Sequence, residues 1–388
     1  MMVLDVFWRF LLLGFTSFGG PAAHLGYFRK EFVERLRWCD ESQYSQWVAL
    51  SQIMPGPGSS QVGFAIGVYR AGILGGIAAF VGFTSPSVVM MIAIASLESS
   101  FATLPYISSL IDALKLLAIV VVLDAIFGMA RGFLASVNTW LIAVCAFVFI
   151  LLWPYGYSGL IVVLFAGIAG TFLTVIPAVS VFHSTVGKRL ALASLALFVL
   201  LFSFAFAVTG SGSLISYLAN LYQAGALVFG GGHVVLPLIT ESLSGIQSTE
   251  DILVGYAAAQ AVPGPMFTIA SYLGSTAAPL GDAVLWGALS TLAIFLPGLL
   301  LMLVGSHYWA HWSHLKVLQK SIIAINASVV GLLFATLINP IVLTSVSNIY
   351  DAIVVAVVFI LSRRLKLPIW QLILLFTVWA AVRMTLPI

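Results

Sequence analysis

The sequence predicts an all-helical membrane protein built from two repeats, in which some helices are broken inside apolar regions. Of its 388 residues, 61% are hydrophobic and only 7% are charged, and the mean hydropathy is +1.13. Soluble domains carry roughly 25% charged residues. Apolar segments of about 20 residues, long enough to cross a bilayer, recur along the whole chain. We therefore expect about 12 or 13 transmembrane segments.

The first half begins with an apolar helix over about 3–18, which ends at a glycine pair. Residues 22–38 mix charges with aromatic side chains, the pattern of an amphipathic helix lying in the membrane interface. A short helix over 42–54, capped near Asp40, stops at Pro-Gly-Pro-Gly because proline lacks the N–H that a helix needs. Such a break persists in a membrane only where protein or a water-filled cavity covers it. The chain resumes over 58–70, and further spans are predicted at 72–97, 105–130, 139–152 and 157–176.

The second half repeats these features after a polar turn at 183–189 and a span at 190–208. A helix over 218–229 ends in glycines, and a segment over 233–247 connects it to a short helix over 250–262. That helix breaks at a second Pro-Gly-Pro and resumes to about 278. Further spans are predicted at 281–305, 316–338, 350–362 and 368–386.

Three motifs recur in the same order and indicate a duplication. Phe18-Gly19-Gly20 matches Phe229-Gly230-Gly231. The motif Gln-x-x-Pro-Gly-Pro occurs at 52–57 and again at 260–265, and Pro86 matches Pro297. The predicted domains are therefore two transmembrane repeats, 1–189 and 190–388.

Charges at equivalent positions differ between the two repeats. Segment 21–41 holds four basic residues, whereas segment 232–251 holds none and carries acidic residues instead. By the positive-inside rule the first segment is cytoplasmic and the second external, which favours the inverted repeats of many secondary transporters. If each broken helix crosses the membrane once, however, the basic residues at 188–189 and 363–366 lie on the external side, against this rule. If the broken pieces are re-entrant hairpins, we expect the repeats to have equal orientation.

The motifs resemble those of the chromate transporter (CHR) family. Phe-Gly-Gly-Pro is followed by a basic segment and by Gln-x-Met-Pro-Gly-Pro, and both motifs return in degenerate form. The resemblance covers essentially the whole chain and implies a long member with two fused units. It also implies a bacterial inner-membrane protein that exports chromate, a sulfate-like oxyanion, and confers chromate resistance. In the second repeat Gly232 replaces Pro21 and Met266 replaces Gly58, so equal substrate contact by both halves stays open.

The two breaks are the candidate substrate site. A dianion needs hydrogen-bond donors and positive potential, and the helix N-termini after each break supply both. No dense cluster of Arg or Lys lies within the predicted spans. The candidates are Phe18, Gly19, Gly20, Gln52, Pro55, Gly56, Pro57, Gly58, Ser59, Ser60 and Gln61 in the first repeat, and Phe229, Gly230, Gly231, Gln260, Pro263, Gly264, Pro265 and Thr268 in the second. The alternative is that proline merely kinks two helices.

Four ionisable residues are candidates for coupling or for attracting the anion. Asp124 lies in an apolar span without an opposite charge within one helical turn, and intramembrane acids are often functional. His24 and His233 follow the glycine breaks and could titrate near neutral pH, with a packing role as the alternative. Arg70 ends the helix after the first break, where a simple loop-end arginine is an equal interpretation.

Other ionisable groups favour structural roles. Asp112 and Lys115 are three residues apart and are expected to neutralise each other. His307, His311 and His314 are spaced for two on one helix face, but neighbouring tryptophans favour an interfacial belt over a metal site. We expect neither a metal nor a cofactor.

The sequence excludes several function classes. It holds no Gly-x-Ser-x-Gly, His-Glu-x-x-His or Walker motif, so we expect a transporter and not an enzyme. The net charge of +3 gives no reason to expect nucleic acid. The favoured function is secondary active export of chromate. An anion channel, a transporter of sulfate or another oxyanion, and a membrane scaffold or sensor are the alternatives. The expected partners are the oxyanion and the lipid bilayer, and a homodimer stays open.

Overall fold

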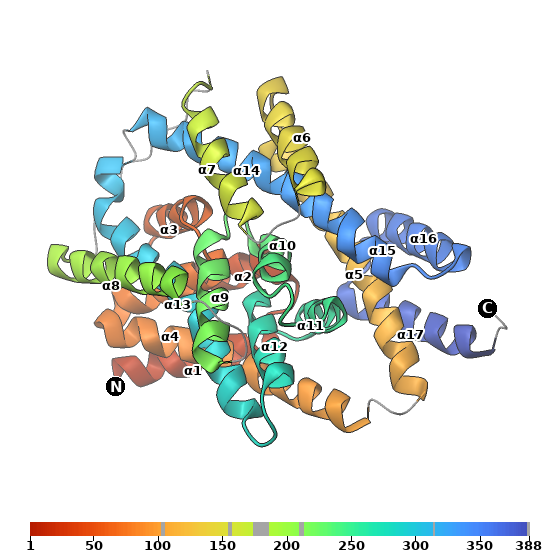
Figure 1. Ribbon diagram of the computed structural model, residues 1–388. Coiled ribbons are helices and arrows are strands. Elements are labelled where there is room, and N and C mark those ends of the chain that lie inside the picture. The colour runs from red at the N-terminus through yellow and green to blue at the C-terminus, as the bar shows by residue number, and fades with distance from the viewer. Residues whose placement is uncertain (102–104, 154–156, 174–185, 209–212, 313–314, 386–388) are drawn as a thin grey trace.

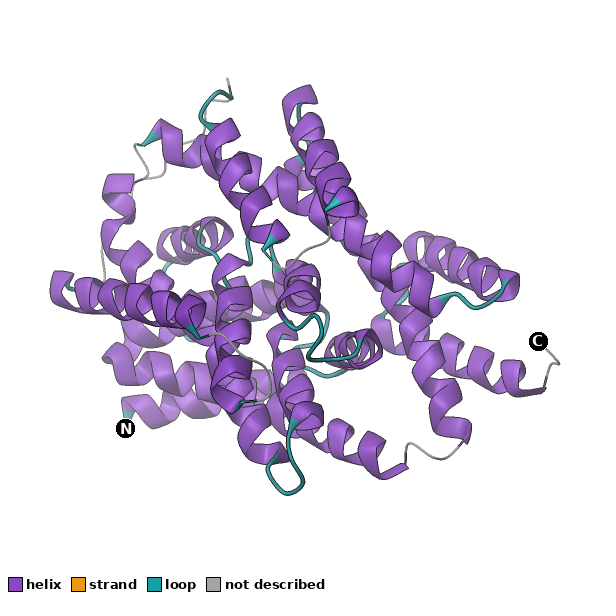
Figure 2. Ribbon diagram, viewed as in Figure 1, coloured by secondary structure: helices purple, strands orange, loops and turns teal. Residues whose placement is uncertain are grey.

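The regular structure of the described residues is entirely helical (Figures 1 and 2). The computed structural model describes residues 1–101, 105–153, 157–173, 186–208, 213–312 and 315–385. The first half contains α1 (Met2–Thr16), α2 (Gly20–Phe28), η1 (Arg29–Arg35), α3 (Glu41–Ile53), α4 (Gly58–Phe101), α5 (Pro105–Phe133), α6 (Val137–Leu152) and α7 (Ser158–Gly170). The second contains α8 (Lys188–Ala207), α9 (Leu214–Leu227), η2 (Gly232–Val234), α10 (Val235–Ser242), α11 (Thr249–Ala261), η3 (Met266–Thr268), α12 (Ile269–Ala277), α13 (Ala283–Trp312), α14 (Lys316–Thr336), η4 (Leu337–Val342), α15 (Leu343–Ser345), α16 (Ile349–Leu365) and α17 (Ile369–Thr385).

Helix α1 and the continuous helix of α2 and η1 form a hairpin whose tip is the first Phe-Gly-Gly segment. Gly19 and Gly20 have φ values of +102° and +77°, which glycine adopts readily, so the chain can reverse there. The Phe10 ring lies 4.7 Å from the Phe32 ring, and both side chains are fully buried. The prediction of an interfacial helix over 22–38 is therefore wrong, because its aromatic face packs against α1.

Helix α3 and the first limb of α4 form a second hairpin, with Pro-Gly-Pro at its tip. The Trp47 and Tyr69 rings lie 5.4 Å apart, whereas a straight helix would separate residues 22 positions apart by about 33 Å. In the second repeat α11 and α12 form the equivalent hairpin, since a Cβ on Gly255 would lie 2.6 Å from the Tyr272 ring. The broken helices are thus re-entrant and do not cross straight through.

Helix α4 reverses again at Ala71 and Gly72, which have non-helical dihedrals. Gly72 has a φ of +65°. Beyond this bend Gly75 packs on Gly67 so closely that a Cβ on Gly67 would lie 2.3 Å from the Gly75 carbonyl oxygen. The second limb of α4 then covers residues 73–101.

The two repeats are inverted where they meet. The second limb of α4 and its counterpart α13 run antiparallel. The Phe80 and Phe295 rings lie 5.2 Å apart, whereas Ile92, further along α4, approaches Gly287, earlier in α13. The expectation that re-entrant hairpins imply equal orientation is wrong. That expectation did not include the hairpin to which α1 belongs. With two hairpins at the start of the first repeat, the described helices that remain before the second repeat are the second limb of α4 and α5 to α8. This is an odd number of helices, so the second repeat starts from the opposite end.

The repeats complete each other and share a core. Helix α5 packs on α16 and α17 of the second repeat, whereas its counterpart α14 packs on α6 and α7 of the first (Figure 1). One hydrophobic cluster accordingly contains residues from Phe64 to Ala380. The domain boundary near residue 189 stays a prediction.

Four described helical segments are long and apolar enough to cross a membrane: Gly58–Glu98, Lys188–Ala207, Ala283–Trp309 and Lys316–Ser345. The first of these contains both limbs of α4, and residues 73–98 of the second limb form its uninterrupted part. Shorter apolar helices are Val137–Leu152, Ser158–Gly170 and Ile369–Met384. The limbs of the re-entrant hairpins are shorter because each reaches only to a tip inside the molecule.

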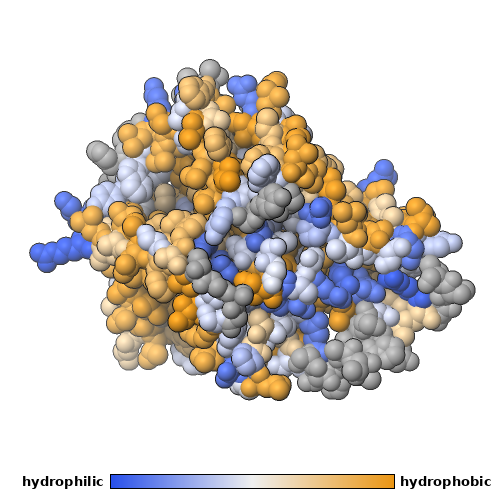
Figure 3. All heavy atoms as spheres, in the orientation of Figure 1, coloured by the Kyte–Doolittle hydropathy of each residue, from blue (hydrophilic) through white to orange (hydrophobic). Residues whose placement is uncertain are grey.

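Charge divides the molecule into a basic end and an acidic end. The basic end holds residues 29–41, the bend of α4 and the C-terminal ends of α5, α13 and α16. Every Lys and Arg lies toward this end except Lys115 and Arg383. The acidic end holds the segment between α10 and α11, over which polar residues gather in Figure 3, with hydrophobic residues around them.

Candidate functional site

The tips of the re-entrant hairpins meet in one junction at the centre of the fold. The Gly56 N–H donates to the Val228 carbonyl at 2.7 Å, and the Gly264 N–H donates to the Ser17 carbonyl at 3.0 Å. These two bonds are equivalent under the duplication, since each joins a Pro-Gly-Pro turn of one repeat to the residue before Phe-Gly-Gly of the other. The repeated sequence motifs therefore supply hydrogen bonds that hold the two repeats together.

Several predicted donors are used inside the junction. The Gln61 amide donates to the carbonyls of Pro55 and Gly298, both at 2.9 Å. The Thr268 hydroxyl donates to the Pro265 carbonyl at 2.7 Å. Ser59, Ser60 and Gln61 are buried, as is Thr268. Substrate contact by these side chains stays a prediction. In this arrangement Gln61 and Thr268 stabilise the turns, whereas the buried Ser60 hydroxyl has no hydrogen-bond partner among the described residues.

The two predicted histidines also lie at the junction. His24 is fully buried, with Nδ1 3.2 Å from the Ser59 hydroxyl and Nε2 3.2 Å from the Ser17 carbonyl. His233 Nδ1 lies 2.9 Å from the Tyr256 hydroxyl. Both histidines connect one hairpin tip to a neighbouring helix.

A polar cavity of about 540 Å³ opens beside the junction, toward the basic end. Five residues predicted from the sequence line it: Gly19, Gly20, Gln260, His233 and Asp124. The other lining residues are Val120, Val121, Arg131, Ser362, Arg363, Lys366, Leu367, Ile369 and Leu372. The cavity thus extends between the first glycine tip and three basic side chains.

The basic side chains come from two helix ends that are distant in sequence. Arg131 lies in the last turn of α5, and Arg363 and Lys366 lie at the end of α16. Arg363 donates to the Asp124 carboxylate at 2.9 Å, and its guanidinium lies 4.9 Å from the centre of the Phe127 ring. Asp124 is therefore not an unpaired acid as the sequence suggested, because its partner is on another helix.

Arg131 and Lys366 form no ion pair with the described residues. With Arg363 they give the cavity three positive charges against one carboxylate. No sequence pattern indicates this cluster, since Arg131 lies more than two hundred residues before Arg363 and Lys366. Such a cavity can hold an anion through charge as well as through backbone donors.

The remaining predicted residues lie elsewhere. Gln52 is exposed and is absent from the cavity wall. Arg70 stacks its guanidinium on the Trp38 ring at 5.1 Å, at the basic end. A Cβ on Gly230 would lie 3.3 Å from the Phe133 ring, whereas a Cβ on Gly231 would meet nothing within 4 Å, and neither glycine lines the cavity.

The pairing expected for Asp112 and Lys115 agrees with the contacts, and the interfacial position expected for the three histidines stays a prediction. Lys115 pairs with Asp112 at 2.9 Å, as predicted, and also with Glu250 at 2.8 Å. His307 Nδ1 lies 2.6 Å from the Val186 carbonyl. The side chains of His311 and His314 are outside the described part of the structure, and within that part no group of three potential metal ligands occurs.

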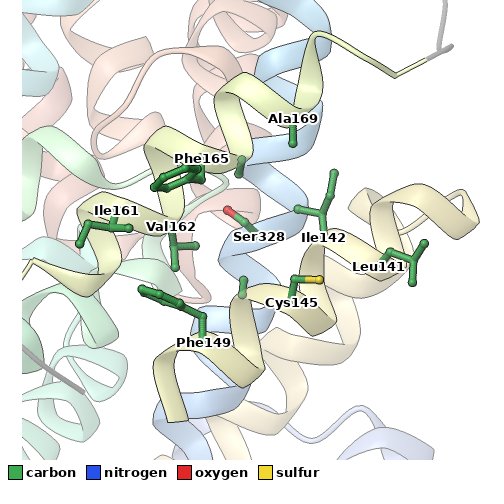
Figure 4. Close-up of a pocket in the computed structure, with 11 residues that line it drawn as sticks. Leu141, Ile142, Cys145, Phe149, Ile161, Val162, Phe165, Ala169 and Ser328 are labelled. Atoms are coloured by element: carbon green, nitrogen blue, oxygen red, sulfur yellow. The ribbon is translucent and has the colours of Figure 1, made fainter. Parts of the chain in front are cut away.

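A second cavity, between α6 and α7, has the wrong chemistry for an anion. Figure 4 shows Leu141, Ile142, Phe149 and Phe165 around it, with the Ser328 hydroxyl as a polar exception. No charged residue lines it. An apolar groove on a membrane protein suits lipid chains better than a dianion.

Comparison with known proteins decides the family. The family model described as Chromate transporter matches residues 4–171 and again residues 215–382. The chain belongs to the chromate transporter family. The double match confirms the duplication, and membership makes the protein a membrane transporter.

Three relatives of this transporter are distant in sequence but match most of its length. It is 25% identical to an uncharacterized transporter of Methanocaldococcus jannaschii, over 87% of this chain and 84% of the relative. It is 26% identical to the chromate transport protein of Pseudomonas aeruginosa, over 86% and 80% of the two chains. A probable chromate transport protein of Synechococcus elongatus is 26% identical over 77% and 75%. No solved structure matches the chain.

Proposed function

We propose that this family member is a secondary active exporter of a tetrahedral oxyanion, with chromate as the first candidate, and that the polar cavity is its cytoplasmic entrance. The observation that carries the proposal is the cluster of Arg131, Arg363 and Lys366 beside the first glycine tip. Two of the similar proteins are named for chromate transport, which supports chromate as the substrate.

The charge distribution supports export as the direction of transport. By the positive-inside rule the basic end faces the cytoplasm, in this proposal of a bacterial inner membrane. The cavity opens toward that end, so a cytoplasmic anion reaches it first. Export would then confer chromate resistance by lowering the internal concentration.

The inner part of the site is formed by the hairpin tips. We propose that the anion passes from the basic side chains to the backbone around Gly19 and Gly20 and to the Gln260 amide. The N–H groups of the helices that begin after Pro57 and Pro265 would receive it as the junction opens, since helix N-termini favour anions. The Gly56 and Gly264 hydrogen bonds across the junction would break and re-form in this step.

Chromate flux in proteoliposomes tests the function. We expect saturable flux that sulfate inhibits and that responds to an imposed pH or voltage gradient. A channel would instead give flux that does not saturate in this range and follows only the electrochemical gradient of the anion. Expression in a chromate-sensitive bacterium is the matching cellular measurement, and export predicts growth at higher chromate concentrations than an empty vector allows.

A further inference from the structure

We propose that the Asp124 carboxylate is a built-in competitor of the transported anion, which occupies Arg363 when the cavity is empty and leaves it when the substrate binds. This inference rests on the proposed function, because it assigns a role to Asp124 within the same cavity. It differs from a role in proton coupling, since the carboxylate acts here as a tethered anion.

The geometry of the pair fits a displaceable contact. The Asp124 side chain is 64% exposed and that of Arg363 only 27% exposed, although their charged atoms are 2.9 Å apart. The Arg363 guanidinium also lies over the Phe127 and Phe359 rings, at 4.9 and 5.8 Å from their centres. The guanidinium therefore has a fixed position, whereas the carboxylate projects into the cavity and can swing away.

The weakness of an exposed ion pair makes displacement possible. Such pairs contribute little because solvent screens both charges. An oxyanion offers the same oxygen geometry to the guanidinium fork and can also contact Arg131 and Lys366, which have no carboxylate partner among the described residues. The substrate thus gains two more charged contacts than Asp124 makes.

The Asp124 carboxylate has a role in the transport cycle when the carrier is empty. The cavity wall is partly apolar, with Val120, Val121 and Leu372 among its residues. An unpaired guanidinium against such a wall is unfavourable once the cavity closes and loses water. Arg131 and Lys366 are exposed and keep their contact with water, whereas the partly buried Arg363 is neutralised by the Asp124 carboxylate, so the empty carrier can close and return.

Anion binding to the purified protein tests the inference. Sulfate affinity is measured by isothermal titration calorimetry for wild type, Asp124→Asn and, as a second neutral variant should the amide fail to fold, Asp124→Ser. We expect the neutral variants to bind sulfate about 3- to 10-fold more tightly, because one competing negative charge is gone. Chromate turnover in proteoliposomes should fall at the same time, because the empty return is slowed. Asp5→Asn is the matched control, since Asp5 loses the same charge at the same end in a pair with Arg9.

The direction of the change separates competition from structural support. If Asp124 only positions Arg363, its loss weakens sulfate binding, and this result or an unchanged affinity overturns the inference. Competition also requires that the gain disappear in an Arg363→Gln background, as a double-mutant cycle can measure. An equal gain in that background would mean general repulsion and would also overturn it.

The same set of variants tests the proposed site independently. If Arg363→Gln alone leaves sulfate affinity unchanged, the cavity is not the anion site and the proposed function of this cavity fails. If Arg363→Gln weakens binding but Asp124→Asn does not strengthen it, the site stands and only the role of Asp124 is wrong.

Discussion

Replacement of Gly56 by alanine should separate the hairpin tips. Gly56 has a φ of +125°, and a Cβ there would lie 2.6 Å from the Cα of Gly298 and 3.0 Å from the Gln61 amide nitrogen. The backbone of Gly298 cannot move aside without shifting α13. The turn must shift instead, which would break the Gly56 N–H bond to Val228.

The cost can be divided into two parts by a matched control. A side chain at positive φ costs about 1–2 kcal/mol, and overpacking a filled site adds about 1–3 kcal/mol. Gly281 has a φ of +93° but would place its Cβ in open space, so Gly281→Ala carries only the first cost. Gly56→Ala should therefore be about 1–3 kcal/mol less stable than Gly281→Ala.

The stabilities of the two detergent-solubilised variants are compared by thermal unfolding, with size-exclusion chromatography to monitor the folded protein. Chromate flux is measured on the same preparations. We expect Gly56→Ala to unfold at a lower temperature than Gly281→Ala and to lose most of its flux. Equal stability and equal flux in the two variants would refute the close contact at the tip, and with it the junction as part of the transport path.

Three further predictions concern the cavity and the N-terminal half. Arg131→Gln should weaken sulfate binding about 10- to 100-fold, which corresponds to the usual free energy of a hydrogen bond to a charged group. The control Lys188→Gln, at the same end but outside the cavity, should bind sulfate as wild type does. Equal affinities of the two variants would contradict the site. Gln260→Leu should weaken binding more than Gln52→Leu, because only Gln260 lines the cavity, and the reverse order in calorimetry would favour the other tip. Burial, with the nearby acidic side chains, raises the pKa of Cys39 to about 12, so its thiol stays neutral up to pH 9. Cys39 should therefore react with maleimide much more slowly in the native than in the unfolded protein. Fast labelling of Cys39 in the native protein would show that this segment is open.

The sequence predicted where the chain breaks but not which way it continues. The Phe-Gly-Gly and Pro-Gly-Pro motifs end helices for local reasons, namely missing N–H groups and permissive dihedrals. Whether the next helix continues or turns back depends on contacts such as that of Trp47 with Tyr69, which no local pattern encodes. The helix over 22–38 was misassigned for the same reason: its aromatic residues suit a membrane interface as well as a neighbouring helix.

The candidate site was predicted in part, and the missing part was electrostatic. Gly19, Gly20 and Gln260 were found because they belong to repeated motifs. Arg363 was interpreted only as a loop charge, since its partner Asp124 is 239 positions away in the sequence. A single sequence shows charge along the chain, whereas the cavity depends on charge brought together by the exchange of helices between the repeats.

The re-entrant hairpins also explain at which end of the molecule the basic residues lie, which the sequence alone left open. With α1 and the Pro-Gly-Pro segment both re-entrant, Lys188 and Arg363 fall at the same end as the basic segment 29–41. The two basic residues at the acidic end are each neutralised there. Lys115 pairs with Asp112 and Glu250, and Arg383 lies 3.6 Å from Asp112. Unpaired positive charge is thereby concentrated at one end, where it raises the local concentration of anions at the mouth of the cavity.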